Sequence, residues 1–297
     1  MSNNPKDLSI IIPSLNEGSF AITTVNNIRN TIELENYEIL IVDSGGTATL
    51  EIATLPMVKV YNVSRQGAPQ ARNFGASKAS SSVLLFIDAH LEFSEGWGQI
   101  LLDQLRRNEN SIITPTISVI GDENSRCSGF KWKNINMDVE WLPDERRKIH
   151  EVPFACGCCM AMTRSLFDDV GKFEDGIRFW GLEDSELCLK CWLFGYKVLC
   201  DPSIRVGHKF RSSFPYKIEW FDIIYNKIWF SLLHFSSSRL TKFLKAVCQE
   251  PDFNSALLMS IGNEVLDKRK YILDRQVNDD NWFFQKFPMS DWVDTIS

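Results

Sequence analysis

The first third of the chain alternates short apolar runs with segments of helical character. The apolar runs cover residues 8–12, 37–43, 58–63 and 83–88, and the helical segments between them are 16–33, 47–54 and 68–80. Short strands that are apolar throughout, and not only at every second residue, are typical of a parallel sheet with helices on both faces. We therefore predict an α/β fold, a three-layer α/β/α sandwich around a mainly parallel sheet.

The rest of the chain extends this sheet and then becomes helical. Further helices are expected at 95–107 and 182–194, strands at 111–119, 152–163 and 196–200, and a mostly helical region at 216–275. The polar segment 121–151 is expected to form a long functional loop or a small subdomain over a ligand site. We predict a main domain over residues 1–212, with a nucleotide-binding half at about 1–92 and an acceptor half at about 93–212, and a helical C-terminal extension over 213–297.

Composition excludes several classes of function. Apolar residues make up 44% of the 297, enough for a full core, and a formal charge of −6 without a stripe of Lys and Arg argues against nucleic acid as a partner. We see no secretory signal and no bilayer-spanning run, so we expect a cytoplasmic protein. The aromatic region 216–235 is expected to dock on the main domain, with peripheral contact to the inner face of a membrane, or a homodimer, as alternatives.

The chain has eight cysteines. Without a secretory signal they are expected to be reduced thiols that fill small core positions. The Cys-x-Cys-Cys segment at 156–159 and the Cys-x-x-Cys segment at 188–191 leave structural zinc as a minor alternative. Their spacing is irregular compared with that of zinc ribbons, which disfavours this alternative.

A candidate metal site lies where the fourth apolar run ends. Asp88 and His90 flank Ala89 directly after that run, and residues at i and i+2 of an extended backbone point to the same side. His208, far downstream, offers another ligand. Imidazole with carboxylate suits manganese better than the all-oxygen set expected for magnesium, which is the alternative ion. Such an ion would hold a diphosphate, although each residue taken singly also fits an ordinary cap or loop role.

A second motif places acidic residues at the start of a predicted helix. Gly181 permits a sharp turn before Glu183 and Asp184. Acidic side chains favour helix N-termini, which explains one acid more easily than several. A carboxylate at a helix tip that faces a cleft could instead act as a general base on an acceptor hydroxyl.

In this order the motifs resemble the GT-A glycosyltransferases. The resemblance is to the large inverting family that begins Pro-x-x-Asn-Glu and, at several points more closely, to the polypeptide N-acetylgalactosaminyltransferases. The matching segments are 11–17, 41–43, 65–73, 85–90, 180–184 and 206–211. Six motifs in the right order over about residues 8–211 are strong support for this fold and for sugar-nucleotide chemistry.

The resemblance implies a role for each matching residue. Those implied in binding the nucleotide sugar are Pro13, Asn16, Glu17, Asp43, Arg72, Asp88, Ala89 and Trp180. Those implied in holding manganese are Asp88, His90 and His208. Those implied at the catalytic, acceptor-facing side are Glu183 and Asp184.

The acidic pair decides between two stereochemical outcomes. The N-acetylgalactosaminyltransferases usually carry Glu-Asn where this chain has Glu183-Asp184, and they retain anomeric configuration, whereas Glu-Asp is the inverting pattern. We therefore predict transfer from a UDP-sugar to a hydroxyl of a glycan or peptide, with inversion and Asp184 as general base. The alternative is retention, with both acids only orienting the sugar. A nucleotidyltransferase and a non-catalytic sugar-binding module are remote alternatives.

Overall fold

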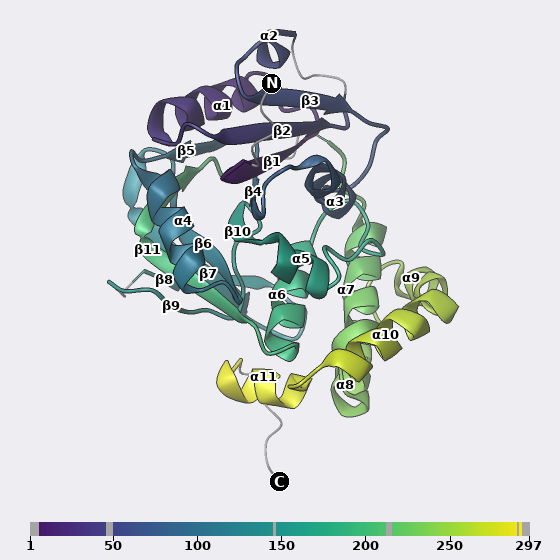
Figure 1. Cartoon of the computed structure of the whole chain (residues 1–297). Helices are drawn as coiled ribbons and strands as arrows, with labels where there is room; N and C mark the ends of the chain where they lie inside the picture. The colour runs from purple at the N-terminus through teal and green to yellow at the C-terminus, as the bar shows by residue number, and fades with distance from the viewer. Residues whose placement is uncertain (1–5, 46–49, 145–146, 212–215, 290, 293–297) are drawn as a thin grey trace.

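One large sheet organises the molecule. The computed structural model describes residues 6–45, 50–144, 147–211, 216–289 and 291–292. Within them, eleven strands form a sheet in the order β3-β2-β1-β4-β10-β6-β11-β5, with β7, β8 and β9 attached through β6 and β11 (Figure 1). The predicted α/β class is confirmed.

The amino-terminal half of the sheet is parallel, as predicted. Its strands are β1 (Leu8–Ser14), β2 (Tyr37–Asp43), β3 (Val58–Asn62) and β4 (Val83–Ile87). Its helices are α1 (Ser19–Thr31), α2 (Leu50–Ala53) and α3 (Ala68–Lys78). Part of the helix predicted at 47–54 falls on residues 46–49, which lie outside the described residues.

Beyond β4 the sheet is mixed, which departs from the expected mainly parallel order. β10 (Cys159–Thr163) runs antiparallel to both β4 and β6 (Ser111–Val119), and β11 (Lys197–His208) runs parallel to β6 and antiparallel to β5 (Leu91–Phe93). Parallel neighbours need a long crossover, usually helical. The chain between β6 and β10 forms strands instead of such a helix, so β10 enters the sheet in the opposite direction.

The segment predicted as a loop or small subdomain is a β-hairpin. β7 (Asp122–Trp132) pairs with β6 and with β8 (Val139–Pro143), and β9 (His150–Glu151) pairs with β11. The long strand predicted at 152–163 is shorter than expected, because only Cys159–Thr163 joins the ladder.

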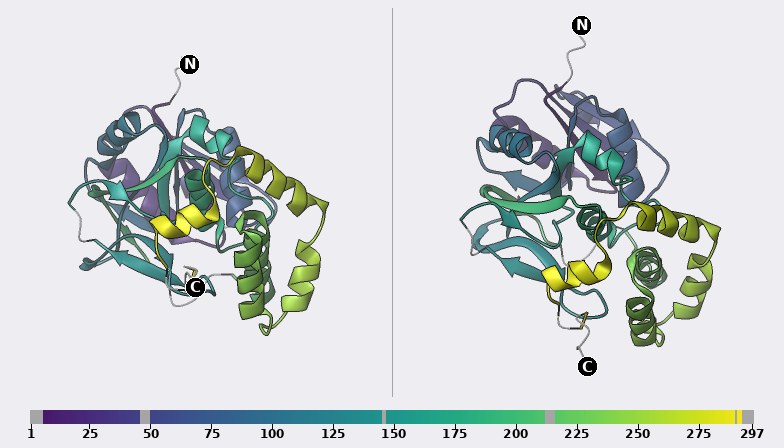
Figure 2. Two further views of the ribbon diagram at one scale, coloured as in Figure 1. Left: turned by 90° about the horizontal axis from the view of Figure 1, so that it is seen from below. Right: turned by 60° about the horizontal axis from the view of Figure 1, so that its bottom comes forward.

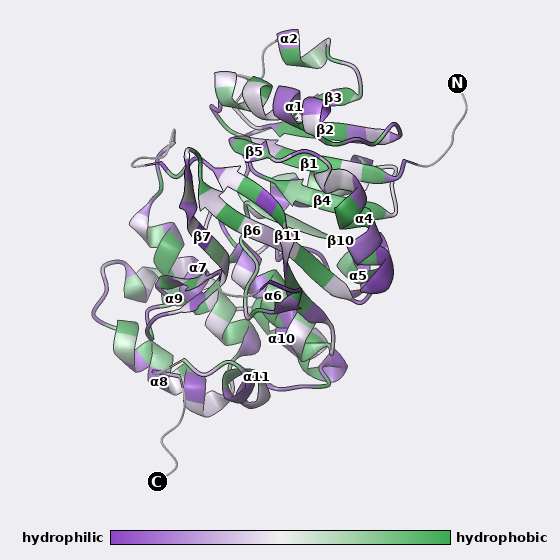
Figure 3. Cartoon of the chain, turned by 90° about the vertical axis from the view of Figure 1, so that its left-hand side faces the viewer, coloured by the Kyte–Doolittle hydropathy of each residue, from purple (hydrophilic) through white to green (hydrophobic). Residues whose placement is uncertain are grey.

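Two hydrophobic clusters cover the two faces of the sheet. Ile10 and Ile12 point into one cluster and Ile11 into the other, which explains why the strand is apolar at every position. Helices α1 and α4 (Trp97–Arg107) cover the first face. Helices α5 (Arg164–Asp169), α6 (Glu183–Leu193) and α7 (Trp220–His234) cover the second. Figure 3 shows the apolar sheet between these helices.

The carboxy-terminal helices share the second cluster with the sheet domain. They are α7, α8 (Ser237–Val247), α9 (Phe253–Ser260), α10 (Asn263–Arg275) and α11 (Asp280–Lys286). Figure 2 shows these helices beside the sheet domain. Ile228, Trp229 and Phe230 of α7 are buried, and the Trp292 ring packs on that of Trp132 with centroids 5.6 Å apart. The core therefore crosses the domain boundary predicted between residues 212 and 213. These two residues themselves lie outside the described part of the chain. None of the helices described is both long and apolar enough to cross a membrane.

All eight cysteines are free thiols, as predicted. Seven are buried and Cys248 is exposed. Among the described residues, the one group that could hold a metal ion contains no cysteine.

Candidate active site

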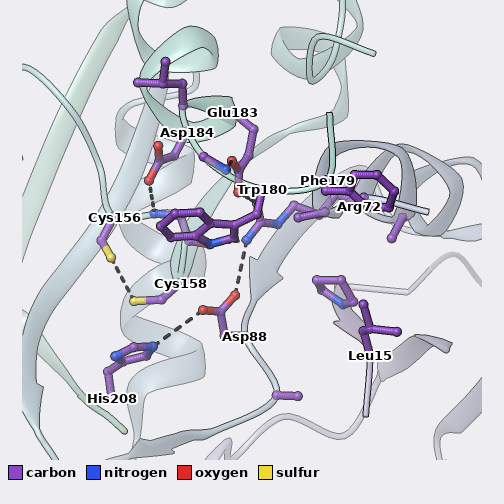
Figure 4. Close-up of a pocket in the computed structure, with 18 of the residues that line it drawn as sticks. Leu15, Arg72, Asp88, Cys156, Cys158, Phe179, Trp180, Glu183, Asp184 and His208 are labelled. Atoms are coloured by element: carbon purple, nitrogen blue, oxygen red, sulfur yellow. Dashed lines mark hydrogen bonds and ion pairs between the residues drawn. The ribbon is translucent and has the colours of Figure 1, made fainter. Parts of the chain in front are cut away.

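The three predicted metal ligands meet at one point of the sheet. Asp88 follows β4, His90 precedes β5, and His208 ends β11. Antiparallel pairing of β11 with β5 sets His208 opposite Leu91, which brings the distant histidine beside the Asp-Ala-His segment. One ligand atom from each residue lies within 4.8 Å of the others, and His208 Nε2 is 3.5 Å from Asp88 Oδ2 (Figure 4).

This donor set fits a divalent metal. Both ring nitrogens of His208 are buried, and neither makes a good hydrogen bond among the described residues: Nδ1 has no partner, and Nε2 faces only Asp88 Oδ2 at 3.5 Å. Burial opposes ionisation of Asp88, but the contact with His208 and the nearby Arg72 and His90 lower its pKa to about 2. An ionised carboxylate beside a weakly satisfied imidazole is the kind of arrangement in which a first-row divalent ion satisfies otherwise costly groups.

His90 is oriented by a pair of charged residues. Its Nδ1 lies 3.3 Å from Glu17 Oε2 and 3.2 Å from an Arg211 guanidinium nitrogen, and Arg211 also forms an ion pair with Glu17. Burial raises the pKa of Glu17, but the bonds from His90 and Arg211 outweigh it and lower that pKa. A carboxylate on one ring nitrogen leaves Nε2 for a metal, so Glu17 supports the metal ligand as well as lining the site.

The acidic pair is carried by an unusual turn. Phe179, Gly181 and Leu182 have positive φ angles of 43°, 100° and 73°, so the sharp turn predicted at Gly181 is present. The turn is anchored from α7, where the Asn226 amide donates to the carbonyl oxygens of Arg178 and Trp180 at 2.8 and 3.1 Å. Asn226 is 1% exposed, and a helix far along the chain thus fixes the start of α6.

Arg72 connects the acidic pair to the metal group. Its guanidinium donates to Glu183 Oε1 at 2.9 Å, to Asp88 Oδ1 at 3.2 Å and to the Gly157 carbonyl at 2.9 Å. Arg72 is buried and its charge is balanced by the protein's own acids, and it also lines the cavity described below. Its expected contact with a nucleotide stays a prediction.

Both acids are already hydrogen-bonded. Glu183 accepts from Arg72 and from Gly181 N at 2.8 Å, and Asp184 accepts from Gly157 N at 3.0 Å and Ser185 N at 2.7 Å. Burial and then the negative charge of Glu183 raise the pKa of Asp184 to about 7, against the opposing effect of these N–H groups and Arg72. The hydrogen bonds to Glu183 and Asp184 therefore hold both carboxylates in fixed positions.

These groups surround a cavity of about 420 Å³. The predicted residues that line it are Pro13, Glu17, Arg72, Asp88, Ala89, His90, Trp180, Glu183, Asp184 and His208. Asn16 and Asp43 are not among the residues that line the cavity, and their expected roles in nucleotide binding stay predictions. Asp43 is 1% exposed and accepts a bond from Gly45 N at 3.1 Å, and a Cβ at Gly45 would lie 2.7 Å from Asn16 Oδ1, so the two side chains pack around the same loop.

Comparison with known families decides the class of protein. A family model described as glycosyl transferase family 2 matches residues 9–171, more than half of the chain. The chain belongs to glycosyl transferase family 2. A second model, described as the N-terminal domain of galactosyltransferase, matches residues 144–211. The resemblance found in the motifs of the chain is confirmed.

Curated relatives of this glycosyltransferase include polypeptide N-acetylgalactosaminyltransferases. It is 31% identical over 234 residues to polypeptide N-acetylgalactosaminyltransferase 10 of Homo sapiens, which is 71% of this chain and 39% of the relative. It is 34% identical over 185 residues to putative polypeptide N-acetylgalactosaminyltransferase 9 of Drosophila melanogaster, which is 56% of this chain and 28% of the relative. The chain spans less than half the length of these relatives.

A solved structure shares the fold of the glycosyltransferase. The crystal structure of GalNAc-T7 with UDP, GalNAc and Mn2+ matches with a TM-score of 0.74 at 22% identity, over 96% of this chain and 57% of that chain. The predicted GT-A fold is confirmed.

Sequence reasoning missed much of the cavity wall of this glycosyltransferase. The β7–β8 hairpin contributes Phe130 and Trp141, and Trp141 packs on Phe210, whose ring lies 4.4 Å from that of His208. The tryptophans in segment 121–151 signalled a functional region, but not that it would be a hairpin. Residues 156–158 also line the cavity, where a buried strand was expected. Gly157 bonds to the side chains of Arg72 and Asp184, so its backbone is not available to the ladder.

Proposed function

We propose that this glycosyltransferase moves a sugar from a UDP-sugar to a hydroxyl of a peptide or glycan. The observation that carries the proposal is the convergence of Asp88, His90 and His208 within 4.8 Å in the wall of the cavity. These residues would hold a divalent cation, manganese or else magnesium. The ion would neutralise the negative charge that develops on the diphosphate leaving group.

The protein's own residues then position the reactants. Glu17 and Arg211 orient the His90 ring, and Arg72 balances the negative charge of Asp88 and Glu183. Trp180 lines the cavity and keeps 38% of its surface exposed, so it presents an aromatic face to a sugar ring. The aromatic wall formed by Trp141 and Phe210 supplies apolar surface for the acceptor and keeps water from the reacting centre.

We infer retention of anomeric configuration, the alternative that the sequence placed second. Each carboxylate oxygen of Asp184 accepts a backbone N–H, and these bonds suit a side chain that holds the turn. The similarity to polypeptide N-acetylgalactosaminyltransferases supports the same choice and an N-acetylhexosamine as the transferred sugar. Glu183 and Asp184 then hold the turn and orient the sugar.

The stereochemistry can be tested without knowing the acceptor. The full chain is incubated with UDP-α-N-acetylgalactosamine and Mn²⁺, and the slow hydrolysis is followed by proton NMR before the released sugar mutarotates. Retention predicts that the α anomer appears first. Early release of the β anomer would contradict retention, and hydrolysis that does not depend on the protein and Mn²⁺ would contradict the proposed activity itself.

A further inference from the structure

Cys156 and Cys158 form a pair of thiols inside the active-site wall. The Cys156 thiol donates a hydrogen bond to Cys158 Sγ with the two sulfur atoms 3.1 Å apart, the one hydrogen bond between two cysteine sulfurs in the described part of the chain (Figure 4). Both residues line the cavity. Other buried thiols bond to the backbone, as Cys127 does to the Ile117 carbonyl. The pair is therefore positioned differently from a cysteine that only fills the core.

The peptide between the two thiols contacts each functional group of the site. Gly157 N donates to Asp184 Oδ2 at 3.0 Å, and the Gly157 carbonyl accepts from Arg72 at 2.9 Å. The Cys158 carbonyl accepts from the backbone N–H of Asp88 at 2.9 Å. Space is also tight, because a Cβ on Gly157 would lie 3.0 Å from Asp184 Oδ2. A change in the backbone at 156–158 must therefore disturb Asp184, Arg72 and Asp88 together.

We propose that Cys156 and Cys158 are a thiol–disulfide exchange site through which a low-molecular-weight disulfide switches the glycosyltransferase off. In the reduced protein the sulfur atoms are 3.1 Å apart, and in a disulfide they are bonded at about 2.05 Å. A bond between residues two positions apart closes a small ring, so the Gly157 peptide must rotate away from its partners. Strained disulfides of this kind are the readily reduced, regulatory ones, so the inactivation is reversible.

The exchange is balanced with glutathione disulfide as the oxidant. The thiolate of one cysteine attacks a sulfur of glutathione disulfide, which gives a mixed disulfide and releases one glutathione. The second cysteine then attacks the protein sulfur of the mixed disulfide, which forms the Cys156–Cys158 bond and releases a second glutathione. The two thiol protons end on the two released thiols, and the dithiol is oxidised as glutathione disulfide is reduced.

The test uses the full chain and two independent readouts. Reduced protein is incubated with glutathione disulfide, and peptide mass mapping determines whether the 156–158 peptide has lost two hydrogen atoms. Calorimetry then measures UDP affinity in Mn²⁺ before oxidation, after it, and after dithiothreitol. We expect the disulfide to form and UDP affinity to fall by roughly 10–100-fold, the usual cost of misplacing groups that orient metal ligands, with recovery on reduction.

Matched variants distinguish oxidation of the Cys156–Cys158 pair from oxidation of the exposed thiol of Cys248. Cys156→Ser and Cys158→Ser cannot form the disulfide, so the 156–158 peptide of each variant should no longer lose two hydrogen atoms with glutathione disulfide, whereas Cys248→Ser should respond as the natural chain does. The proposal is wrong if the mapping finds glutathione on Cys248 alone, or if a 156–158 disulfide forms and UDP affinity does not change. The effect on UDP rests on the proposed function, but the mapping does not. A reduced protein that fails to bind UDP would therefore contradict that function and still leave the disulfide to be decided.

Discussion

The two sides of the cavity differ in how completely their polar atoms are satisfied. On the metal side, formed by Asp88, His90 and His208, the buried Nδ1 of His208 has no partner among the described residues, and the buried Nε2 has only the 3.5 Å contact with Asp88. On the acidic side, both oxygens of Glu183 and both oxygens of Asp184 accept hydrogen bonds from Arg72 or from backbone N–H groups. The metal side is therefore suited to binding a ligand, whereas hydrogen bonds within the protein fix the carboxylates of Glu183 and Asp184 on the acidic side.

This difference separates binding from support. Buried polar groups without partners cost free energy, so a protein keeps them where a ligand compensates for them. Hydrogen-bonded carboxylates at a helix start instead hold a turn whose backbone is unfavourable at Phe179 and Leu182. The comparison supports the proposal that the diphosphate binds on the metal side and that the acidic side places the sugar.

The largest expected effect is on the metal side. His208→Ala removes one of three ligands, and we expect Mn²⁺-dependent hydrolysis of UDP-sugar to fall by more than about 100-fold, since loss of a group that merely orients a ligand costs roughly 10–100-fold. The rate is measured at saturating Mn²⁺. His150→Ala is the matched control, because His150 bonds to the Lys148 carbonyl away from the cavity and its loss should leave the rate unchanged. Equal rates in the two variants would contradict the assignment of His208.

Arg72→Ala tests the connection between the two sides. It leaves Asp88 and Glu183 without their shared cation, and removal of one partner of a buried ion pair costs about 3–5 kcal/mol of unfolding free energy. Urea denaturation measures the change. Arg106→Ala removes an exposed pair with Asp103 and should cost less than about 1 kcal/mol. Similar losses in both variants would mean that Arg72 does not connect the two sides.

Asn226→Ala tests the anchor of the acidic turn. The Asn226 amide also accepts from Arg178 N at 2.7 Å, so the variant leaves several backbone groups of the turn without partners, at a cost of about 1–3 kcal/mol. We expect UDP-sugar turnover to fall together with stability. The matched control is Asn278→Ala, which removes one amide bond to the Trp192 carbonyl and should lower stability without lowering turnover of the folded protein. Normal turnover by folded Asn226→Ala would exclude the anchoring role.

Asp184→Asn should have the smallest effect on turnover. If Asp184 only supports the turn, an amide of similar shape keeps one of its two backbone N–H bonds, and the rate of donor hydrolysis should stay within about tenfold, whereas loss of a general base costs about 100-fold or more. Steady-state rates with UDP-α-N-acetylgalactosamine give the comparison. A loss beyond 100-fold in a folded variant would restore the inverting interpretation.

The same variant makes a prediction about pH. Burial and the Glu183 charge raise the pKa of Asp184 to about 7 in the folded protein, so between about pH 4 and pH 7 the folded state keeps a proton that the unfolded state has lost. This group therefore stabilises the fold at low pH, and its contribution is lost as pH rises to 7. Urea midpoints at pH 4.5 and 7.5 should show a smaller decline in Asp184→Asn than in the natural chain. An unchanged decline would show that Asp184 does not titrate in this range.

The sequence predicted the metal side through two different signals. The apolar run that ends in Asp88 and His90 is a local signal of a strand end. His208 was predicted from the order of the motifs, and the pairing of β11 with β5 is the contact that brings it to the same place. The acidic side was predicted only in part. The support from Asn226 and Arg72, and the exposure of Cys156 to the cavity, arise from contacts between distant segments that no local pattern records.

The most direct test of the account is whether UDP binding requires a divalent ion. Calorimetric titration of UDP into the full chain is compared in Mn²⁺ and in EDTA. If Asp88, His90 and His208 bind the diphosphate through a cation, UDP should bind in Mn²⁺ and show no measurable heat in EDTA. Equal affinity in both buffers would show that the diphosphate is held without a metal and would contradict the account.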